Sequence, residues 1–228
     1  GKTGINSKQG KNLVGTFYQP DFVLSDISMI KSLPRREMIC GYGEILKHAL
    51  IKDKNFFLWL SKNGKKIIYE KNKKLLKIAV VKSCKIKSNI ITKDEKESNL
   101  RMILNFGHTF AHGFEGAKKF SKKLNHGEAV LLGMMMACKL SYKKKLLPLR
   151  DLLLIKKNYL DLRLPINLKE KFKRKEINNI ISFMKRDKKN VSEKINLVLI
   201  DRIGKTPKLN NFTSSSMDLK KFLLSQYI

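Results

Sequence analysis

The chain has 228 residues, a formal net charge of +30 and a 42% share of hydrophobic residues. This length allows a sizeable core, as one large helical domain or as one domain plus a fragment. The sequence shows no secretory signal, and its longest apolar run, residues 129–138, is too short to span a bilayer. We therefore expect a soluble, cytoplasmic protein with no membrane partner.

The positive charge raises the question of nucleic-acid binding, because a basic surface attracts phosphate groups. The excess consists almost entirely of lysines spread over the whole length, with few arginines and no basic motif interleaved with aromatic residues. We therefore do not expect nucleic acid to be the main partner, whereas a preference for small anions fits the composition. The three cysteines form no C-x-x-C pair, which suits buried free thiols in a reducing compartment.

Residues 1–31 are predicted to form a glycine-punctuated loop that ends in a short strand over residues 22–26. The opening G-K-T-G resembles part of a phosphate-binding loop, but the full G-x-x-x-x-G-K-[ST] pattern is absent. The residues alone therefore favour a flexible loop with solvated lysines.

A helix is predicted over residues 32–51, with Ser32 or a neighbour as its cap and Pro34 in its first turn. Gly41 and Gly43 lie inside this helix, where each costs about 1 kcal/mol relative to alanine. That cost indicates the close approach of another backbone or of a ligand.

Glu44 and Lys47 follow one turn apart on the same helix face. They form either a surface ion pair or a metal-binding carboxylate beside an anion-binding lysine. The next predicted elements are an apolar core helix within residues 53–70 and a long helix over residues 72–92.

A polar stripe marks the helix predicted over residues 97–112. At helical spacing five polar side chains lie on one face, namely Glu97, Arg101, Asn105, His108 and His112. The opposite side is apolar, so we expect the helix to be buried. A buried polar stripe is costly unless it lines a site, and a functional site is therefore predicted along this face.

After a basic connection over residues 118–123, residue 126 begins a strongly apolar helix that we expect to be the central core helix. His126 lies at its N-terminal edge, where the helix dipole disfavours a protonated imidazole. The remaining predicted elements are helices near residues 151–160 and 176–185, a charged turn over 186–190, a strand over 194–200, a serine-rich linker over 213–216 and a last helix over 218–227.

Three of the four histidines fall in or beside the polar stripe. Glu44, His108 and His126 would form a set of two histidines and one carboxylate that leaves a coordination position open, as catalytic zinc sites do. The alternative is a pair of core histidines satisfied by hydrogen bonds. Because position 109 is Thr, the metalloprotease pattern H-E-x-x-H is absent.

Eight segments, in order and at matching spacings, resemble the 3-dehydroquinate synthase family. They are G-K-T-G-I-N, G-K-N-L-V-G-T-F-Y-Q-P, L-P-R-R-E, G-E-I-L-K, S-C-K-I-K, D-E-K-E-S-N-L-R-M-I-L-N-F-G-H-T-F-A-H, H-G-E-A-V-L-L-G-M and R-D-K-K. The resemblance covers almost the whole chain. It implies a mainly α fold: residues 32–228 as the C-terminal helical metal- and substrate-binding domain, and residues 1–31 as a short remnant of a Rossmann-like NAD-binding domain.

The resemblance also implies roles for single residues. The metal ligands would be Glu44, His108 and His126, with Zn²⁺ as the expected ion and Co²⁺ as a possible substitute. The substrate-binding positions would be Lys2, Asn12, Lys47, Lys87, Arg101, Asn105 and Lys188. The catalytic groups would be His112 and Glu97 for proton transfer and Asn105 for orientation. The positions that contact NAD would be Lys2, Lys11, Met29, Ile30, Lys31 and Ser32.

The implied reaction converts 3-deoxy-D-arabino-heptulosonate 7-phosphate to 3-dehydroquinate and phosphate, a step of the shikimate pathway toward aromatic amino acids. It proceeds by transient oxidation with NAD, elimination of phosphate, reduction and aldol closure. Family members are commonly homodimers. This sequence departs from the family because it starts at the loop that follows most of the NAD-binding domain. We therefore expect it to keep the metal-site geometry without tight NAD binding or turnover.

Two other interpretations stay open on the sequence. One is another sugar-phosphate cyclase, which would be expected to alter the basic and amide positions at Lys87, Arg101 and Asn105. The other is a lysine-rich fragment that binds anions or RNA and lacks both metal and catalysis.

Overall fold

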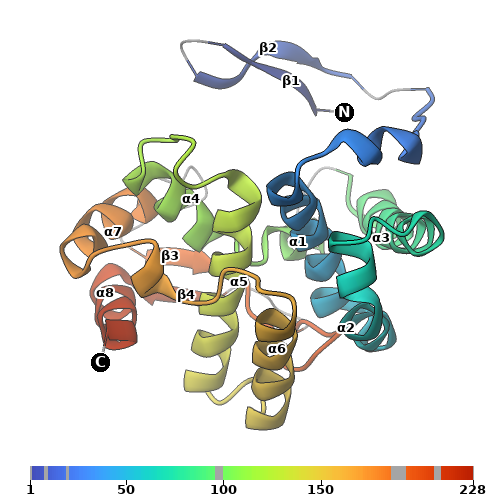
Figure 1. Ribbon diagram of the computed structural model, residues 1–228. Coiled ribbons are helices and arrows are strands. Elements are labelled where there is room, and N and C mark those ends of the chain that lie inside the picture. Colours follow the sequence, from blue (N-terminus) through green and yellow to red (C-terminus); the bar gives the residue numbers. More distant parts are fainter. Residues whose placement is uncertain are drawn as a thin grey trace.

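The computed structural model describes residues 2–7, 10–18, 21–95, 100–185, 194–207 and 212–227. In these ranges the chain is mainly helical, which confirms the predicted class (Figure 1). The α-helices are α1 (Arg35–Lys52), α2 (Lys54–Ile68), α3 (Lys73–Lys93), α4 (His108–Ala117), α5 (His126–Lys143), α6 (Leu149–Asp161), α7 (Ile177–Lys185) and α8 (Ser216–Leu224). The strands are β1 (Lys2–Ser7), β2 (Gly10–Phe17), β3 (Lys194–Leu197) and β4 (Phe212–Ser215). Short 3-10 helices are η1 (Ile27–Ser32), η2 (Leu100–Asn105), η3 (Leu168–Glu170), η4 (Arg174–Glu176) and η5 (Ser225–Tyr227).

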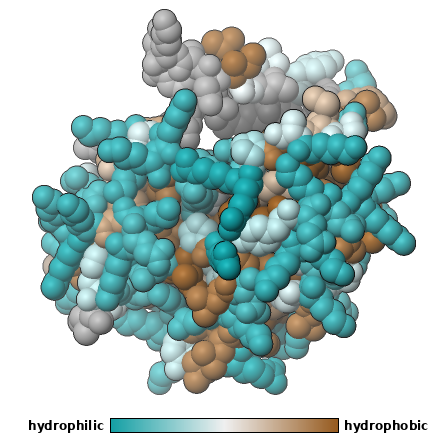
Figure 2. All heavy atoms as spheres, in the orientation of Figure 1, coloured by the Kyte–Doolittle hydropathy of each residue, from teal (hydrophilic) through white to brown (hydrophobic). Residues whose placement is uncertain are grey.

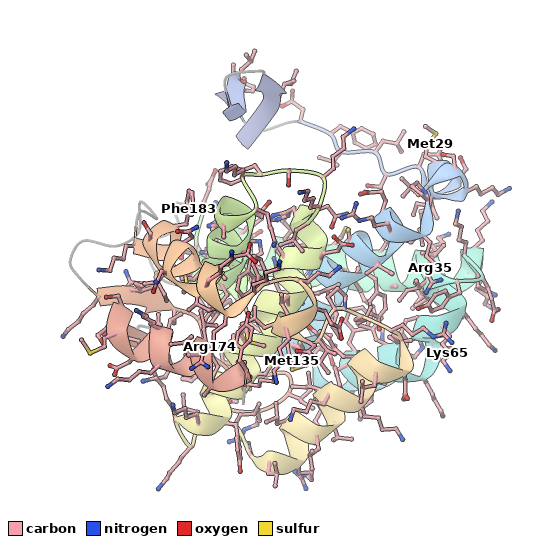
Figure 3. The ribbon with its side chains drawn as sticks, turned by 60° about the vertical axis from the view of Figure 1, so that its left-hand side comes forward. Met29, Arg35, Lys65, Met135, Arg174 and Phe183 are labelled. Atoms are coloured by element: carbon pink, nitrogen blue, oxygen red, sulfur yellow. The ribbon has the colours of Figure 1, made fainter. Side chains whose placement is uncertain are left out.

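Helix α5 lies at the centre of the helical body, as predicted, and packs against α4 on one side and α1 on the other (Figure 1). Its side chains are buried almost all round, and Met135 lies in the middle of the bundle (Figure 3). A capping box fixes its first turn: the Asn125 side chain accepts from the backbone N–H of Glu128, and the Glu128 carboxylate accepts from that of Asn125. This cap satisfies donors that a helix start leaves unpaired.

Two glycines allow the helices around α5 to approach closely. A Cβ on Gly133 would lie 2.2 Å from the carbonyl oxygen of Gly107, and one on Gly43 would lie 3.0 Å from Cγ of Leu131. At Gly43 the close neighbour is the side chain of Leu131 rather than the predicted backbone. At Gly41 no atom of the described residues lies within 4 Å of the Cβ position, so no backbone approaches there either, and the approach of a ligand stays a prediction.

The segment predicted as one helix over residues 97–112 is instead broken. Residues 100–105 form η2, Gly107 takes a left-handed conformation at φ +80°, and α4 begins at His108. The physical reason is the crossing with α5, since a Cβ on Gly107 would lie 2.6 Å from Cγ of Met134 and 2.7 Å from its backbone nitrogen. The chain therefore turns at the glycine rather than continuing the helix.

The N-terminal segment also differs from the prediction. Instead of a loop, β1 and β2 form an antiparallel hairpin with Ile5 opposite Val14, and it lies apart from the helical body in Figure 1. Residues 22–26, predicted as a strand, follow an irregular path. Phe22 and Leu24 there are 78% and 79% exposed, so the hydrophobic run that suggested a strand pairs with no neighbour among the described residues.

The serine-rich stretch at residues 213–216, predicted as a linker, forms most of β4 and the first residue of α8. Strand β4 pairs antiparallel with β3, in which Ile195 and Leu197 are buried. Ser215 then caps α8 through its side-chain oxygen, which accepts from the backbone of Asp218. The serines are thus used for pairing and capping. The strand predicted from residue 194 is confirmed, although it ends at Leu197 rather than at residue 200.

Helix starts elsewhere agree with the sequence to within a few residues. Asn72 caps α3 through its side chain, whereas Pro34 rather than Ser32 precedes α1, and the Ser32 hydroxyl donates to the carbonyl of Met29. The thiol prediction is correct only for Cys138, because Cys84 is exposed and Cys40 is partly buried.

Hydrophilic side chains cover most of the visible face of the helical body (Figure 2). In the described part of the chain, no helix is both long and apolar enough to cross a membrane.

Candidate metal and anion site

Three predicted ligands from three different helices lie together. Glu44 comes from the middle of α1, and His108 and His126 are the first residues of α4 and α5. Each offers one ligand atom, and these atoms all lie within 4.8 Å of one another. Oε1 of Glu44 is 3.8 Å from Nε2 of His108, and the rings of His108 and His126 are 5.4 Å apart between centroids.

The local fold keeps the imidazole of His108 neutral. Burial lowers the pKa of His108 to about 3, and the nearby Lys47 ammonium acts in the same direction. Its place at the start of α4 adds to this effect, because a helix N-terminus carries partial positive charge. A metal requires the neutral form of histidine, so the first turn of α4 presents a ligand in the correct protonation state.

The two carboxylate oxygens of Glu44 have different surroundings, and the difference bears on whether a metal fits. Its Oε2 accepts a hydrogen bond from Nζ of Lys47 at 2.6 Å. The side chain is 39% exposed overall, yet Oε1 is buried and has no hydrogen-bond partner among the described residues. Burial alone would raise the pKa of Glu44, but the Lys47 ammonium holds it below its ordinary value. An ionised oxygen that faces a neutral imidazole without a donor fits a divalent cation.

The three residues open onto a cavity of about 270 Å³. Its lining consists of the three proposed ligands, four further predicted site residues and two residues that the sequence did not single out for the site: Glu44, His108 and His126, then Lys47, Lys87, Arg101 and Asn105, then His48 and Leu104. The structure therefore brings the predicted ligands together with Lys47, Lys87, Arg101 and Asn105. Three cations in the lining of one small cavity favour an anionic guest.

The cations are fixed by separate means. Lys47 is only 4% exposed, so the alternative of a surface ion pair with Glu44 is wrong. Burial lowers the pKa of Lys47, whereas its pairing with Glu44 opposes that shift. Arg101 is held at the end of α3, because its backbone N–H donates to the Asp94 carboxylate at 2.9 Å and its guanidinium donates to the carbonyl of Glu95 at 2.6 Å.

Two residues of the site were not assigned a role from the sequence. His48 is 4% exposed, lines the cavity and shares a 2.7 Å hydrogen bond between Nδ1 and the hydroxyl of Ser83. Glu115 is 3% exposed, and its Oε2 lies 3.2 Å from Nδ1 of His126. The sequence could have indicated His48 by its place one turn after Glu44. It could have indicated Glu115 as a carboxylate on the same short helix as His108.

Other predicted residues lie elsewhere or outside the described ranges. The rings of His112 and His108 are 5.9 Å apart between centroids, and His112 does not line the cavity. Glu97 and Lys188 lie outside the described residues. Of the predicted NAD contacts, Lys2 is on β1 and Lys11 on β2, whereas Met29, Ile30, Lys31 and Ser32 are on η1 and do not line the cavity. Asn12 lies on β2. Met29 is 70% exposed at the outer edge of the molecule (Figure 3).

Comparison with known families gives two matches along the chain. Residues 41–190 match the family described as 3-dehydroquinate synthase C-terminal, and residues 1–40 match the one described as 3-dehydroquinate synthase N-terminal. A Pelagibacter ubique protein named 3-dehydroquinate synthase is 51% identical over 219 residues, which cover 96% of this chain and 59% of that protein. A protein of the same name from Thermodesulfovibrio yellowstonii is 41% identical over 223 residues, which cover 98% of this chain and 60% of that protein. The chain thus spans less than two thirds of the length of these relatives.

Solved structures share the fold at lower identity. A 2-epi-5-epi-valiolone synthase from Streptomyces hygroscopicus, with NAD⁺ and Zn²⁺ bound, superposes with a TM-score of 0.81 at 24% identity, over 99% of this chain and 61% of that one. A 2-deoxy-scyllo-inosose synthase complexed with carbaglucose-6-phosphate, NAD⁺ and Co²⁺ gives a TM-score of 0.78 at 21% identity, over 98% of this chain and 62% of that one.

Proposed function

Because this chain belongs to the 3-dehydroquinate synthase family, we propose that it forms the metal- and substrate-binding part of an enzyme that makes 3-dehydroquinate. The substrate in this proposal is 3-deoxy-D-arabino-heptulosonate 7-phosphate, and phosphate is the second product. The observation that carries the proposal is the unpartnered Oε1 of Glu44, which faces His108 at the edge of a cavity with a cationic lining.

Glu44, His108 and His126 would hold the divalent metal, with Zn²⁺ first and Co²⁺ as a substitute. Three protein ligands leave a position open for substrate oxygen. When bound, such an ion would polarise a substrate hydroxyl, and NAD would supply the hydride-transfer chemistry. NAD⁺ is named with both of the solved structures that share this fold, together with Zn²⁺ in one and Co²⁺ in the other.

The substrate carries a carboxylate and a phosphate, which match the cations in the cavity lining. Lys47, Lys87 and Arg101 would bind these groups, and Asn105 would orient a hydroxyl through its side-chain amide. Lys188, Lys2 and Asn12 complete the proposed substrate contacts. We assign proton transfer to His112 and Glu97.

The proposed NAD contacts are Lys2 and Lys11 on the hairpin and Met29, Ile30, Lys31 and Ser32 on η1, and the four on η1 lie outside the cavity lining. The proposal is that the 228-residue chain alone binds metal without turnover. The proposal includes a domain boundary near residue 31, where η1 ends, a cytoplasmic location and a homodimer.

The rival cyclase function is weaker on two grounds. The relatives named 3-dehydroquinate synthase reach 51% identity, whereas the solved cyclases share 24% or less and support the fold alone. The basic and amide residues at Lys87, Arg101 and Asn105 are those that the family resemblance requires. An RNA-binding fragment explains neither the paired histidines nor the buried oxygen of Glu44.

A chimera tests the function. This chain would replace the matched 59% of the Pelagibacter ubique protein, and phosphate release from the sugar phosphate would be followed with and without NAD and Zn²⁺. We expect release that requires both. A folded chimera that binds Zn²⁺ but releases no phosphate would overturn the assignment, and measurable 3-dehydroquinate formation by the 228-residue chain alone would contradict the expected lack of turnover.

A further inference from the structure

A buried carboxylate lies behind one of the proposed metal ligands. Glu115, on α4, is 3% exposed and lies outside the lining of the cavity, and its Oε2 is 3.2 Å from Nδ1 of His126. The His126 side chain is by contrast 49% exposed. The contact therefore joins the buried Glu115 to His126, which is the most exposed of the three proposed ligands.

Burying a carboxylate costs free energy unless a donor compensates for the lost water. The N–H on Nδ1 of His126 is such a donor, provided that the imidazole is in the Nδ1–H tautomer. In that tautomer Nδ1 is occupied and the lone pair is on Nε2. Nε2 is then the only nitrogen of His126 that can bind a metal.

The same helix supplies both parts of this arrangement. Its first residue, His108, is one proposed ligand, and Glu115, about two turns further on, orients the ring of the other histidine. A carboxylate that accepts from the free nitrogen of a histidine ligand fixes its orientation and raises its basicity, and loss of such a partner costs roughly 10–100-fold in metal affinity.

We propose that Glu115 is a positioning residue for the metal site: it holds His126 in the Nδ1–H tautomer so that Nε2 faces Glu44 and His108. This inference rests on the proposed function, because it assumes that Glu44, His108 and His126 bind a metal. Glu115 itself touches neither substrate nor metal in this assignment.

The test compares Glu115→Gln with Glu176→Gln in the full 228-residue chain. Glu176 is the control, because its carboxylate also accepts from a basic side chain, Lys118 at 2.9 Å, but its hydrogen bonds go to Lys118 and to the backbone of Lys173 rather than to a proposed metal ligand. Zn²⁺ affinity would be measured by competition with a chromophoric chelator, and the stability of the metal-free protein by urea unfolding. We expect Glu115→Gln to weaken Zn²⁺ binding by about 10–100-fold and Glu176→Gln to leave it unchanged.

A purely structural role for Glu115 predicts a different result, namely lower stability of the metal-free protein with unchanged Zn²⁺ affinity, and that result would overturn the proposal. A second measurement covers the case in which the variant fails to fold. Long-range ¹H–¹⁵N NMR of the unmodified metal-free chain reports the tautomer of His126 directly. An Nδ1–H tautomer is expected, and an Nε2–H tautomer would refute the proposal. If the unmodified chain binds no Zn²⁺ but shows the Nδ1–H tautomer, the metal-dependent function fails while the Glu115 contact stands.

Discussion

Lys47 donates a hydrogen bond from Nζ to Oε2 of Glu44 at 2.6 Å, so one oxygen of the proposed metal-binding carboxylate is occupied by an ammonium group and the other remains without a partner among the described residues. Lys47 itself is 4% exposed. The pair therefore has two functions in this account. It stabilises the negative charge of Glu44 in the absence of metal, and it leaves Oε1 directed at His108.

Removal of the Lys47 charge tests the first function. Lys47→Met keeps an unbranched side chain one atom shorter and removes the charge, so the Glu44 carboxylate loses its ammonium partner. We expect the metal-free chain to lose about 1–2 kcal/mol of unfolding free energy, a figure reduced for the partial exposure of Glu44. Saturating Zn²⁺ should restore part of this loss. Urea unfolding with and without Zn²⁺ measures both values, and a Lys47→Met chain as stable as the unmodified one would show that the ion pair does not stabilise Glu44.

His48 is predicted to stay neutral well below the usual range for histidine. Burial, followed by the charge of Lys47, lowers its pKa from 6.5 to about 4. The unfolded chain therefore takes up this proton first as the pH falls. Stability attributable to His48 is fully present above pH 6.5 and is lost progressively as the pH falls toward 4, by up to about 3 kcal/mol.

NMR titration of the His48 ring measures this pKa directly. Little protonation is expected down to about pH 5, and a midpoint near 6.5 would contradict the burial argument. In urea unfolding, lowering the pH from 6.5 to 4 should reduce the unfolding free energy of His48→Gln by less than that of the unmodified chain.

The crossing of α4 and α5 should tolerate no added methyl group at Gly133. Its Cβ would lie 2.2 Å from the carbonyl oxygen of Gly107, a backbone atom that cannot move without shifting His108. We expect Gly133→Ala to cost about 2–4 kcal/mol and to weaken Zn²⁺ binding.

Gly41→Ala is the matched control on α1, because the described residues leave its Cβ position open. This change should raise stability by up to about 1 kcal/mol, as glycine-to-alanine changes in helices do. Equal effects of the two substitutions in thermal unfolding would show that the helix crossing does not set the stability.

Arg36 and Glu128 connect α1 to the start of α5. The guanidinium donates to both carboxylate oxygens, at 2.8 and 2.6 Å, and also to the carbonyl of Lys122 at 2.9 Å. Lysine cannot reproduce this two-pronged contact, so Arg36→Lys should lower the unfolding free energy by about 0.5–1.5 kcal/mol. Arg202→Lys, at an exposed pair with Asp201 separated by 3.7 Å, should change stability by less than about 0.5 kcal/mol. An equal response of both variants would exclude a special role for the Arg36 contact.

The sequence predicted the helices well because their patterns are local. The apolar run after His126 and the apolar spacing over residues 72–92 are patterns among neighbouring residues, and α5 and α3 form as expected. The break at Gly107 could not be predicted in this way. Its cause is Met134 of α5, a contact between helices that only the folded chain shows.

In the candidate site too, the sequence indicated the residues but not the contacts between helices. Residue types and spacing indicated Glu44, His108 and His126, and their proximity is seen in the structure. The hydrogen bond from His126 to Glu115 and that between His48 and Ser83 depend on which helix faces which, so no periodicity in the sequence could reveal them. The hairpin of β1 and β2 and the pairing of β4 with β3 likewise arise from pairing between strands rather than from the residues of one strand.

Zinc analysis of the purified chain after exhaustive dialysis tests the central claim most directly, with Glu44→Ala and His126→Ala measured beside the unmodified protein. We predict about one equivalent of tightly held Zn²⁺ in the folded chain, a loss of most of it in each variant, and a Zn²⁺-dependent rise in unfolding free energy only in the unmodified chain. A folded, metal-free protein whose stability neither variant changes and Zn²⁺ does not raise would contradict the account.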